Sequence, residues 1–241
     1  MTQLRHRHVA LAAFLATAFA APAYAQDEQE PAGGDGGFDI SATATGVSDY
    51  RFRGVSASDR DPALQGSVDV AWHGFYAGAW ASSIARTADT NVELDLYAGY
   101  TGNAGPLEYD FGVIAYLYPG GDGTATVYEG KASLSYSLGP ATGKVSLNYA
   151  PDQENLAGDN LYLNGELRVG IPTTPVTVFA SLGRERGSFY GRKWDWSLGL
   201  EFTRGPFTAS LAYVDTNLDS ATSFLGRNIR AGVVASASFE F

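Results

Sequence analysis

No charged side chain falls on the apolar face of any predicted strand, and this exclusion limits the possible folds more than any other feature of the sequence. From Phe38 onward, successive segments alternate apolar and polar residues. When the pattern has a period of two, alternate side chains lie on opposite faces of a β-strand. An Arg or Lys that faces the middle of a membrane costs about 2–4 kcal/mol. The pattern therefore predicts an all-β protein whose apolar face meets lipid.

Twelve segments carry this alternation. The C-terminal segment ends on Phe241 without a tail, and a terminal strand left alone would present two unpaired edges. A closed barrel pairs that strand with the one before it and with the first strand of the chain. We therefore predict a transmembrane, antiparallel, up-and-down β-barrel, in which only 75–83 has ambiguous faces. The twelve predicted strands are 38–53, 64–72, 75–83, 92–100, 107–117, 128–138, 144–149, 161–171, 176–182, 194–202, 207–213 and 228–241.

The connections between these segments alternate in length. The short ones are 73–74, 102–106, 139–142, 172–175 and 204–206. The long ones are 54–62, 84–90, 119–125, 150–160, 184–193 and 215–227. Short periplasmic turns and long outer loops are typical of bacterial outer-membrane barrels, and an even strand number places both termini on the periplasmic side.

Aromatic residues gather near both ends of the predicted strands, as in the two girdles of a membrane barrel. Those near the short turns are Trp72, Phe75, Tyr100, Tyr109, Tyr136, Phe202, Phe207, Phe239 and Phe241. Those near the long loops are Tyr50, Phe52, Tyr128, Tyr149, Trp194, Trp196 and Tyr213.

The first 25 residues have the organisation of a secretory signal peptide. A basic start with Arg5 and Arg7 is followed by an apolar run, and the small residues around Ala25 fit a cleavage site. Residues 26–37 are acidic and glycine-rich and predict a disordered periplasmic leader before the barrel at 38–241. We expect the mature protein in the outer membrane of a Gram-negative bacterium. The net charge is −10, and loss of the two arginines leaves −12, which argues against a nucleic-acid partner.

One stretch near the start of the mature chain, Gly46–Asp69 with the run Ser48-Asp-Tyr-Arg-Phe-Arg-Gly-Val-Ser56, resembles the TorF-type putative porin family of proteobacteria. The later segments 93–100 and 109–113 look similar to that family as well. The resemblance implies an outer-membrane barrel. It also implies that the terminal Phe241 acts as a signal for the barrel-assembly machinery. It implies little about the solute.

The faces that would point into the barrel carry twelve acidic and six basic residues. Rings of carboxylates favour cations, so the sequence predicts a porin-like channel for small solutes with a preference for cations. The pore-lining candidates are Asp69, Glu93, Asp95, Glu108, Asp110, Glu129, Lys131, Glu166, Arg168, Asp195 and Glu201. The alternative is a closed structural, adhesion or assembly barrel whose charges pair and fill the interior. A barrel of eight strands is just filled and one of 16–18 encloses a channel, so twelve strands leave both open.

Four basic residues crowd the predicted connection 184–193 and are candidates for contact with anionic outer-leaflet lipid: Arg184, Arg186, Arg192 and Lys193. The sequence gives no sign of an enzyme, a cofactor or a metal site. It contains no cysteine, and the only histidine of the mature chain, His73, lies in a predicted two-residue turn away from the outer loops. A soluble periplasmic β-protein remains a less favoured reading of the same alternation.

Overall fold

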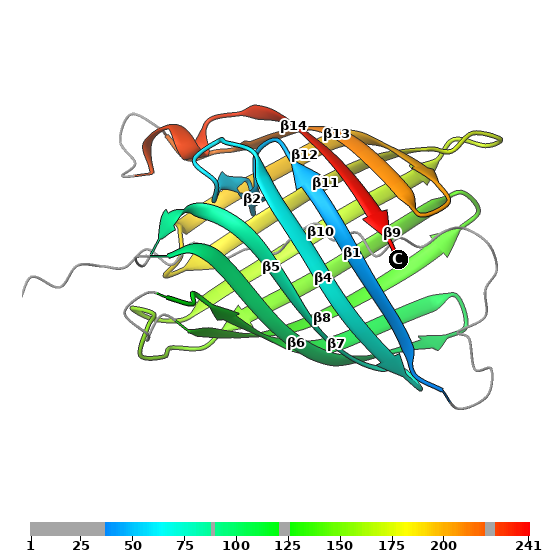
Figure 1. Ribbon diagram of the computed structural model, residues 1–241, viewed down its shortest axis with the longest axis horizontal. Coiled ribbons are helices and arrows are strands. Elements are labelled where there is room, and N and C mark those ends of the chain that lie inside the picture. Colours follow the sequence, from blue (N-terminus) through cyan, green and yellow to red (C-terminus); the bar gives the residue numbers. More distant parts are fainter. Residues whose placement is uncertain (1–36, 88–89, 121–125, 220–224) are drawn as a thin grey trace, which may run out of the picture.

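The computed structural model of the 241-residue chain describes residues 37–87, 90–120, 126–219 and 225–241. Twelve antiparallel strands form one closed barrel, which confirms the predicted fold and strand number (Figure 1). The wall strands are β1 (Asp39–Val47), β4 (Ala63–Trp72), β5 (Phe75–Thr87), β6 (Thr90–Ala104), β7 (Leu107–Leu117), β8 (Val127–Leu138), β9 (Ala141–Ala150), β10 (Asn160–Gly170), β11 (Val176–Gly187), β12 (Gly191–Arg204), β13 (Phe207–Thr216) and β14 (Gly232–Glu240). None of the described residues forms a helix long and apolar enough to cross a membrane.

The last strand closes the barrel, as its sequence predicts. β14 pairs with β13 on one side and with β1 on the other, where Ala44 stands opposite Phe239 and Gly46 opposite Ala237. β1 in turn pairs with β4 along its whole length. Because each remaining strand pairs with its neighbours in sequence, the order around the wall is a simple up-and-down meander.

The outward face of the wall is apolar and the inward face is polar. Large apolar side chains remain exposed on the outside, among them Leu64, Val113 and Leu198. The ambiguous segment 75–83 presents Phe75 outward, at 58% exposure, and buries Trp80 inside, at 6%. Aromatic rings lie close together near one end of the wall, between neighbouring strands in the pairs Phe75–Tyr100 and Tyr100–Tyr109 and along the C-terminal segment in the pair Phe239–Phe241.

The two ends of the barrel differ. One end, called the turn end below, carries the connections 73–74, 105–106, 139–140, 171–175 and 205–206 and also the start of β1 and the C-terminus. The loop end carries 48–62, 151–159 and 188–190, the described residues 118–120, 126, 217–219 and 225–231, and the paired ends of β5 and β6 at Thr87 and Thr90. Two connections predicted to be long, 84–90 and 184–193, are mostly strand, because β5–β6 and β11–β12 continue their pairing past the apolar band to Thr87–Thr90 and Gly187–Gly191.

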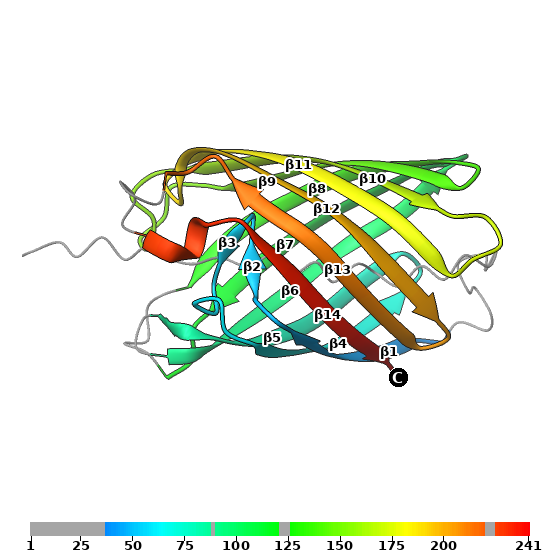
Figure 2. The same ribbon diagram turned by 90° about the horizontal axis from the view of Figure 1, so that it is seen from above.

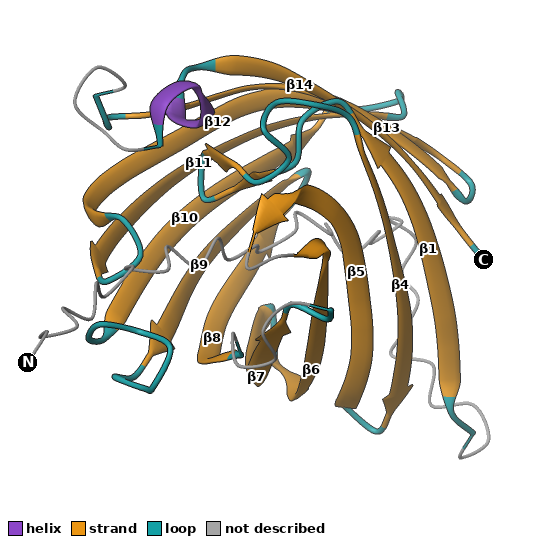
Figure 3. Ribbon diagram, turned by 60° about the vertical axis from the view of Figure 1, so that its left-hand side comes forward, coloured by secondary structure: helices purple, strands orange, loops and turns teal. Residues whose placement is uncertain are grey.

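The connection after β1 corrects a second prediction. The first strand was expected to run through residue 53, but β1 ends at Val47. The chain then forms a separate hairpin of β2 (Arg51–Phe52) and β3 (Val55–Ser56) inside the barrel near the loop end (Figures 2 and 3). The short helix η1 (Gly226–Ile229) lies beside it at the same end. The predicted signal peptide and nearly all of the predicted leader, residues 1–36, lie outside the described residues.

Candidate functional site

The tip of the inner hairpin is a tight turn. Arg53 and Gly54 both have positive φ, at 47° and 85°, between the paired residues Phe52 and Val55. Positive φ at both central positions characterises the two-residue turns that match the twist of a hairpin. A Cβ built on Gly54 would lie 2.5 Å from Cγ2 of Thr216, so the tip rests against the β12–β13 wall and has room only for glycine.

Hydrogen bonds at the base hold the hairpin in place. The Asp49 carboxylate accepts one bond from Nε of Arg51, at 2.7 Å, and another from the hydroxyl of Ser56, at 2.6 Å. Arg51 also donates to the carbonyl of Arg230, at 2.9 Å, just before β14. The two legs of the hairpin are thus tied to each other and to the end of the neighbouring wall strand.

Aromatic rings fill the space between the hairpin and the wall. Tyr50 and Phe52 were expected in the lipid-facing girdle, but both are buried inside, at 2% and 0% exposure. The Tyr50 ring lies 5.4 Å from that of Trp80, and the hydroxyls of Tyr50 and Tyr118 each donate to Glu93 at 3.2 Å. Burial, and after it the charge of Glu93, raises the pKa of the Tyr50 phenol well above its usual value, so the phenol stays a donor.

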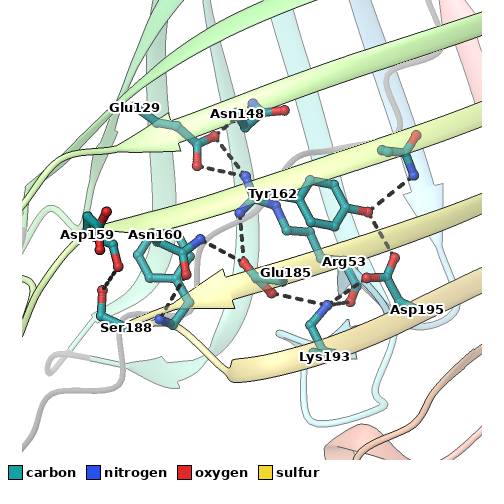
Figure 4. Close-up of polar contacts among 12 residues, drawn as sticks. Arg53, Glu129, Asn148, Asp159, Asn160, Tyr162, Glu185, Ser188, Lys193 and Asp195 are labelled. Atoms are coloured by element: carbon teal, nitrogen blue, oxygen red, sulfur yellow. Dashed lines mark hydrogen bonds and ion pairs between the residues drawn. The ribbon is translucent and has the colours of Figure 1, made fainter.

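Arg53 connects two distant parts of the wall across the interior. Its guanidinium donates to both carboxylate oxygens of Glu129 on β8, at 2.8 and 2.7 Å, and to Oε1 of Glu185 on β11, at 2.8 Å (Figure 4). Side-chain amides support the same acceptors, because Asn148 donates to Glu129 at 2.9 Å and Asn160 to Glu185 at 3.0 Å. None of the three charged side chains of this bridge has any exposed surface.

Lys193 extends the network along β12 and β11. Its ammonium lies 3.2 Å from Oε2 of Glu185 and 2.7 Å from Oδ2 of Asp195 (Figure 4). It also donates to the backbone carbonyl of Arg53, so the lysine holds the main chain at the tip of the hairpin. The hydroxyl of Tyr162 donates to Asp195 at 2.9 Å, and the Tyr162 ring lies under the Arg53 guanidinium at 4.3 Å.

The network compensates buried charge that would otherwise be costly. An ion without a partner in a protein interior costs several kcal/mol even after relaxation. Burial alone would lower the pKa of Arg53, but the charges of Glu129 and Glu185 outweigh it and raise the pKa above its ordinary value. The hairpin is therefore held in the barrel by a charged arginine that lies between two glutamate side chains.

The half of the interior toward the turn end is different, because its charged residues keep partial exposure. Lys131 lies 3.4 Å from Asp110, and Arg168 lies 3.5 Å from Glu166 and forms a second ion pair with Glu201. No residue of the hairpin enters this half. The barrel interior thus carries partly exposed charged residues toward the turn end and is filled toward the loop end.

Glycines in this wall let aromatic side chains lie flat. The Tyr97 hydroxyl donates to Asp69, and its ring covers Gly78 on the neighbouring strand. A Cβ on Gly78 would lie 2.6 Å from the Tyr97 hydroxyl. The absence of a side chain on Gly78 therefore lets the Tyr97 ring lie against the wall.

The eleven pore-lining candidates divide between these two regions. Asp69, Glu108, Asp110, Lys131, Glu166, Arg168 and Glu201 are partly exposed in the interior. Glu93, Asp95, Glu129 and Asp195 are buried at 5% exposure or less around the hairpin. These four line a packed region in this structure rather than a water-filled one.

The four basic residues proposed to contact lipid also separate. Arg184, Arg186 and Arg192 are exposed on the outward face of β11 and β12. Lys193 corrects the prediction, because it points inward and is 1% exposed. The prediction treated 184–193 as a loop, in which strand parity does not apply, and the residues are in fact paired strands.

Sequence reasoning missed the central role of Arg53 and the inward positions of Glu185 and Lys193. The sequence contained part of the signal for an inner hairpin. Arg53-Gly54 is followed by the short apolar-polar pair Val55-Ser56, and it lies in the stretch Gly46–Asp69 that carries the family resemblance. The strand parity beyond Leu182 would also have placed Glu185 on the inward face.

The chain was compared with known sequence families and structures. The model of the family Gcw_chp, described as a bacterial protein of unknown function, matches residues 31–239. It does not carry the TorF name, which therefore stays a resemblance. No curated protein matches the chain in sequence.

Several solved barrels share the fold at low sequence identity. A KdgM porin is 10% identical with a TM-score of 0.57, over 83% of this chain and 99% of that one. A KdgM porin in complex with disordered oligogalacturonate is 10% identical with a TM-score of 0.56, over 84% and 98%. The COG4313 outer membrane channel from Pseudomonas putida F1 is 9% identical with a TM-score of 0.51, over 88% and 99%. At these identities the likeness shows the fold alone.

Proposed function

This chain belongs to the Gcw_chp family of bacterial proteins, and we propose that it is an outer-membrane, porin-like channel for passive diffusion of small solutes. The observation that carries the proposal is the division of the barrel wall. Its outward face is apolar between two ends rich in aromatic rings, while its inward face keeps partly exposed charged residues toward the turn end. Such a wall suits lipid outside and water inside.

The orientation follows from the same proposal. With the turn end in the periplasm, both termini lie on the side from which an exported chain reaches the outer membrane. Phe241, which is 74% exposed at the end of the closing strand, is then accessible to the barrel-assembly machinery before closure. We expect residues 1–25 to be removed during export.

We propose a preference for cations. The partly buried charged residues that face the interior outside the hairpin region comprise six acids and three bases: Asp69, Glu108, Asp110, Glu166, Glu201 and Glu240, against Lys131, Lys144 and Arg168. An acidic lining attracts cations and repels anions. One similar porin is described in complex with an oligogalacturonate, which is an acidic saccharide. The acidic excess here makes such an anionic solute a poor candidate.

The inner hairpin is the barrier of this channel. Tyr50 at its base packs against Trp80 of β5, and the hairpin itself contacts β8 through Glu129 and β11 and β12 through Glu185 and Lys193, so this segment bridges the interior between those strands. Conductance then depends on the fraction of time for which the hairpin is separated from its ionic contacts. Water that hydrates the separated charges lowers the free energy needed to release the hairpin.

Planar-bilayer recordings of the refolded protein under a salt gradient test the proposal. We expect discrete conductance steps and a reversal potential of the sign that cations produce. A reversal potential of the opposite sign would contradict the cation preference alone. A folded, membrane-inserted barrel that never conducts would contradict the channel itself.

The buried network also favours a second candidate, a closed structural or assembly barrel. The hairpin fills the loop-end half through buried ionic contacts with the wall, including an Arg53–Glu129 bridge without exposed surface. A variant in which the hairpin is released discriminates the two candidates. A channel conducts more after release, whereas a structural barrel loses stability without gaining a defined conductance.

A further inference from the structure

We propose that Arg184, Arg186 and Arg192 form a binding site for the phosphate groups of a glycolipid in the outer leaflet of the outer membrane. All three are exposed on the outward face of the β11–β12 hairpin, close to its tip at the loop end. The inference rests on the membrane placement proposed above and adds a ligand site on the outside of the wall, away from the solute path.

The pairing of the two strands brings like charges together. Arg186 stands directly opposite Arg192, and Arg184 stands opposite Trp194 one pair further in. Residues directly opposite in an antiparallel pair have Cβ atoms about 4.5–5.5 Å apart, and like charges in such positions destabilise the sheet. A counter-anion between the two guanidiniums removes that repulsion.

The protein itself supplies no such anion among its described residues. None of the three arginines forms an ion pair with a carboxylate of the described chain. Glu185, between two of them in sequence, points inward to Arg53 and Lys193. Asp215, on the outward face of the next strand, accepts a hydrogen bond from Tyr213 at 2.9 Å.

The order of residues along both strands fits a lipid headgroup. Toward the loop end of β11, the outward residue Leu182, at 52% exposure, precedes the two arginines. In the same direction along β12, the outward leucines come first, then Trp196 and Trp194, and finally Arg192. Aromatic girdles mark the membrane interface, and the residues just beyond them meet the headgroups. The Arg184 guanidinium lies 4.7 Å from the centre of the Trp194 ring, which leaves its donors free to point outward.

Phosphate is the anion that this arrangement fits best. Guanidinium groups bind phosphate through paired, charge-assisted hydrogen bonds, and several arginines can share one phosphate group. Exposed apolar surface adjoins the arginines, because Leu161 and Leu163 on β10 stand opposite Arg186 and Arg184 and Leu182 is the next outward residue of β11; this surface suits the acyl chains of the same molecule. A freely soluble anion would use only the arginines and none of this apolar surface.

Binding can be measured without any ion flux. The refolded barrel in a non-ionic detergent is titrated with bis-phosphorylated lipid A and followed by native mass spectrometry. We expect a stoichiometric adduct that survives activation, with affinity at least about tenfold weaker for monophosphorylated lipid A, because one phosphate then shares fewer arginines. The triple variant Arg184→Gln, Arg186→Gln, Arg192→Gln should lose the adduct.

Controls separate this site from charge in general and from the channel. Arg204 is also exposed and outward but lies at the turn end, so Arg204→Gln should bind lipid A like the wild type. The single variant Arg192→Gln relieves the opposed pair, so it should fold at least as well as the wild type and still bind lipid A more weakly. Equal binding by the wild type, Arg192→Gln and the triple variant would overturn the inference. If a variant no longer binds lipid A but conducts like the wild type, the lipid site and the channel are separate, and the channel proposal still stands.

Discussion

Replacing Arg53 by glutamine should release the inner hairpin. The substitution keeps much of the side-chain volume but leaves Glu129 and Glu185 as buried carboxylates without their shared cation. Removing one partner of a buried ion pair costs about 3–5 kcal/mol. We call the hairpin docked when it holds its contacts with the wall and released when it has left them. If the cost destabilises the docked state, the equilibrium shifts by roughly 10² to 10³-fold or more toward the released state. The wall strands pair with one another without the hairpin, so the barrel itself should persist.

Single-channel recording is the decisive assay. For the Arg53→Gln variant we expect a larger or more frequently open conductance than for the wild type, at equal insertion into the bilayer. Far-ultraviolet circular dichroism and heat-modifiable migration on gels should show the same barrel in both proteins. A wild-type conductance trace from a correctly folded Arg53→Gln protein would refute the view that the hairpin is the barrier.

Two further variants show whether the effect comes from buried charge. Arg168 also bridges two glutamates, but its side chain is 26% exposed in the turn-end half, so water can replace it and Arg168→Gln should leave the open probability unchanged. Converting Glu129 and Glu185 to glutamine in the Arg53→Gln background removes the uncompensated charges. That triple variant should recover much of the closed state, and failure to do so would show that shape rather than charge holds the hairpin.

Three other expectations follow from the structure. Gly78→Ala places a methyl group where the Tyr97 ring lies and should lower the free energy of unfolding by about 0.5–1.5 kcal/mol, through loss of the Tyr97 hydrogen bond, as measured by thermal or urea unfolding in detergent. A hydrogen bond from Arg227 lowers the pKa of Asp59. The contact between the hairpin loop and η1 should therefore be constant above the ordinary pKa of aspartate, about 3.9, and should weaken as the pH falls through the lowered pKa. Amide hydrogen exchange in 226–229 measures the strength of this contact. Glu108→Gln removes one partly exposed lumen carboxylate and should move the reversal potential toward zero.

Each of these three expectations has its own contrary result. Tyr97→Phe removes the same hydrogen bond without crowding, so equal stability of Tyr97→Phe and the wild type would show that the bond contributes nothing. Exchange in 226–229 that keeps its pH dependence in Arg227→Gln would mean that another group controls the η1 contact. A reversal potential that moves away from zero in Glu108→Gln would contradict an acidic selectivity region.

The barrel could be predicted from the sequence because one physical rule acts on every strand. Lipid excludes charge from alternate positions, and this leaves a period-two record that survives even where individual strands are weak. Closure, strand number and the order of the strands follow from that record together with the need to pair both edges of the final strand. The rule did not predict the ends of the strands, as at 184–193. Strand pairing continues there beyond the apolar part of the wall, and charged residues occur on both faces.

The inner hairpin could not be predicted by the same rule. Tyr50 and Phe52 keep the parity of β1, and an aromatic side chain has the same identity whether it faces lipid or fills the interior. What distinguishes the segment is the tight turn at Arg53-Gly54 and a set of partners that come from four distant strands. Such long-range ion pairs have no period and leave no pattern in a single sequence.

The chemistry of the hairpin contacts bears on whether it is a fixed plug or a movable barrier. Apolar packing alone would favour a permanently closed interior, since buried ion pairs are often less stabilising than well-packed apolar residues of the same size. Here the tip of the hairpin is held by Arg53, Glu129, Glu185 and Lys193, all of which regain strong hydration when they separate. Lys131 and Asp110, which pair with partial exposure, mark the adjoining half of the interior from which water could reach the separating groups. Tight closure in the docked state and a hydrated released state are both compatible with these contacts, and this combination is what a gated diffusion channel requires.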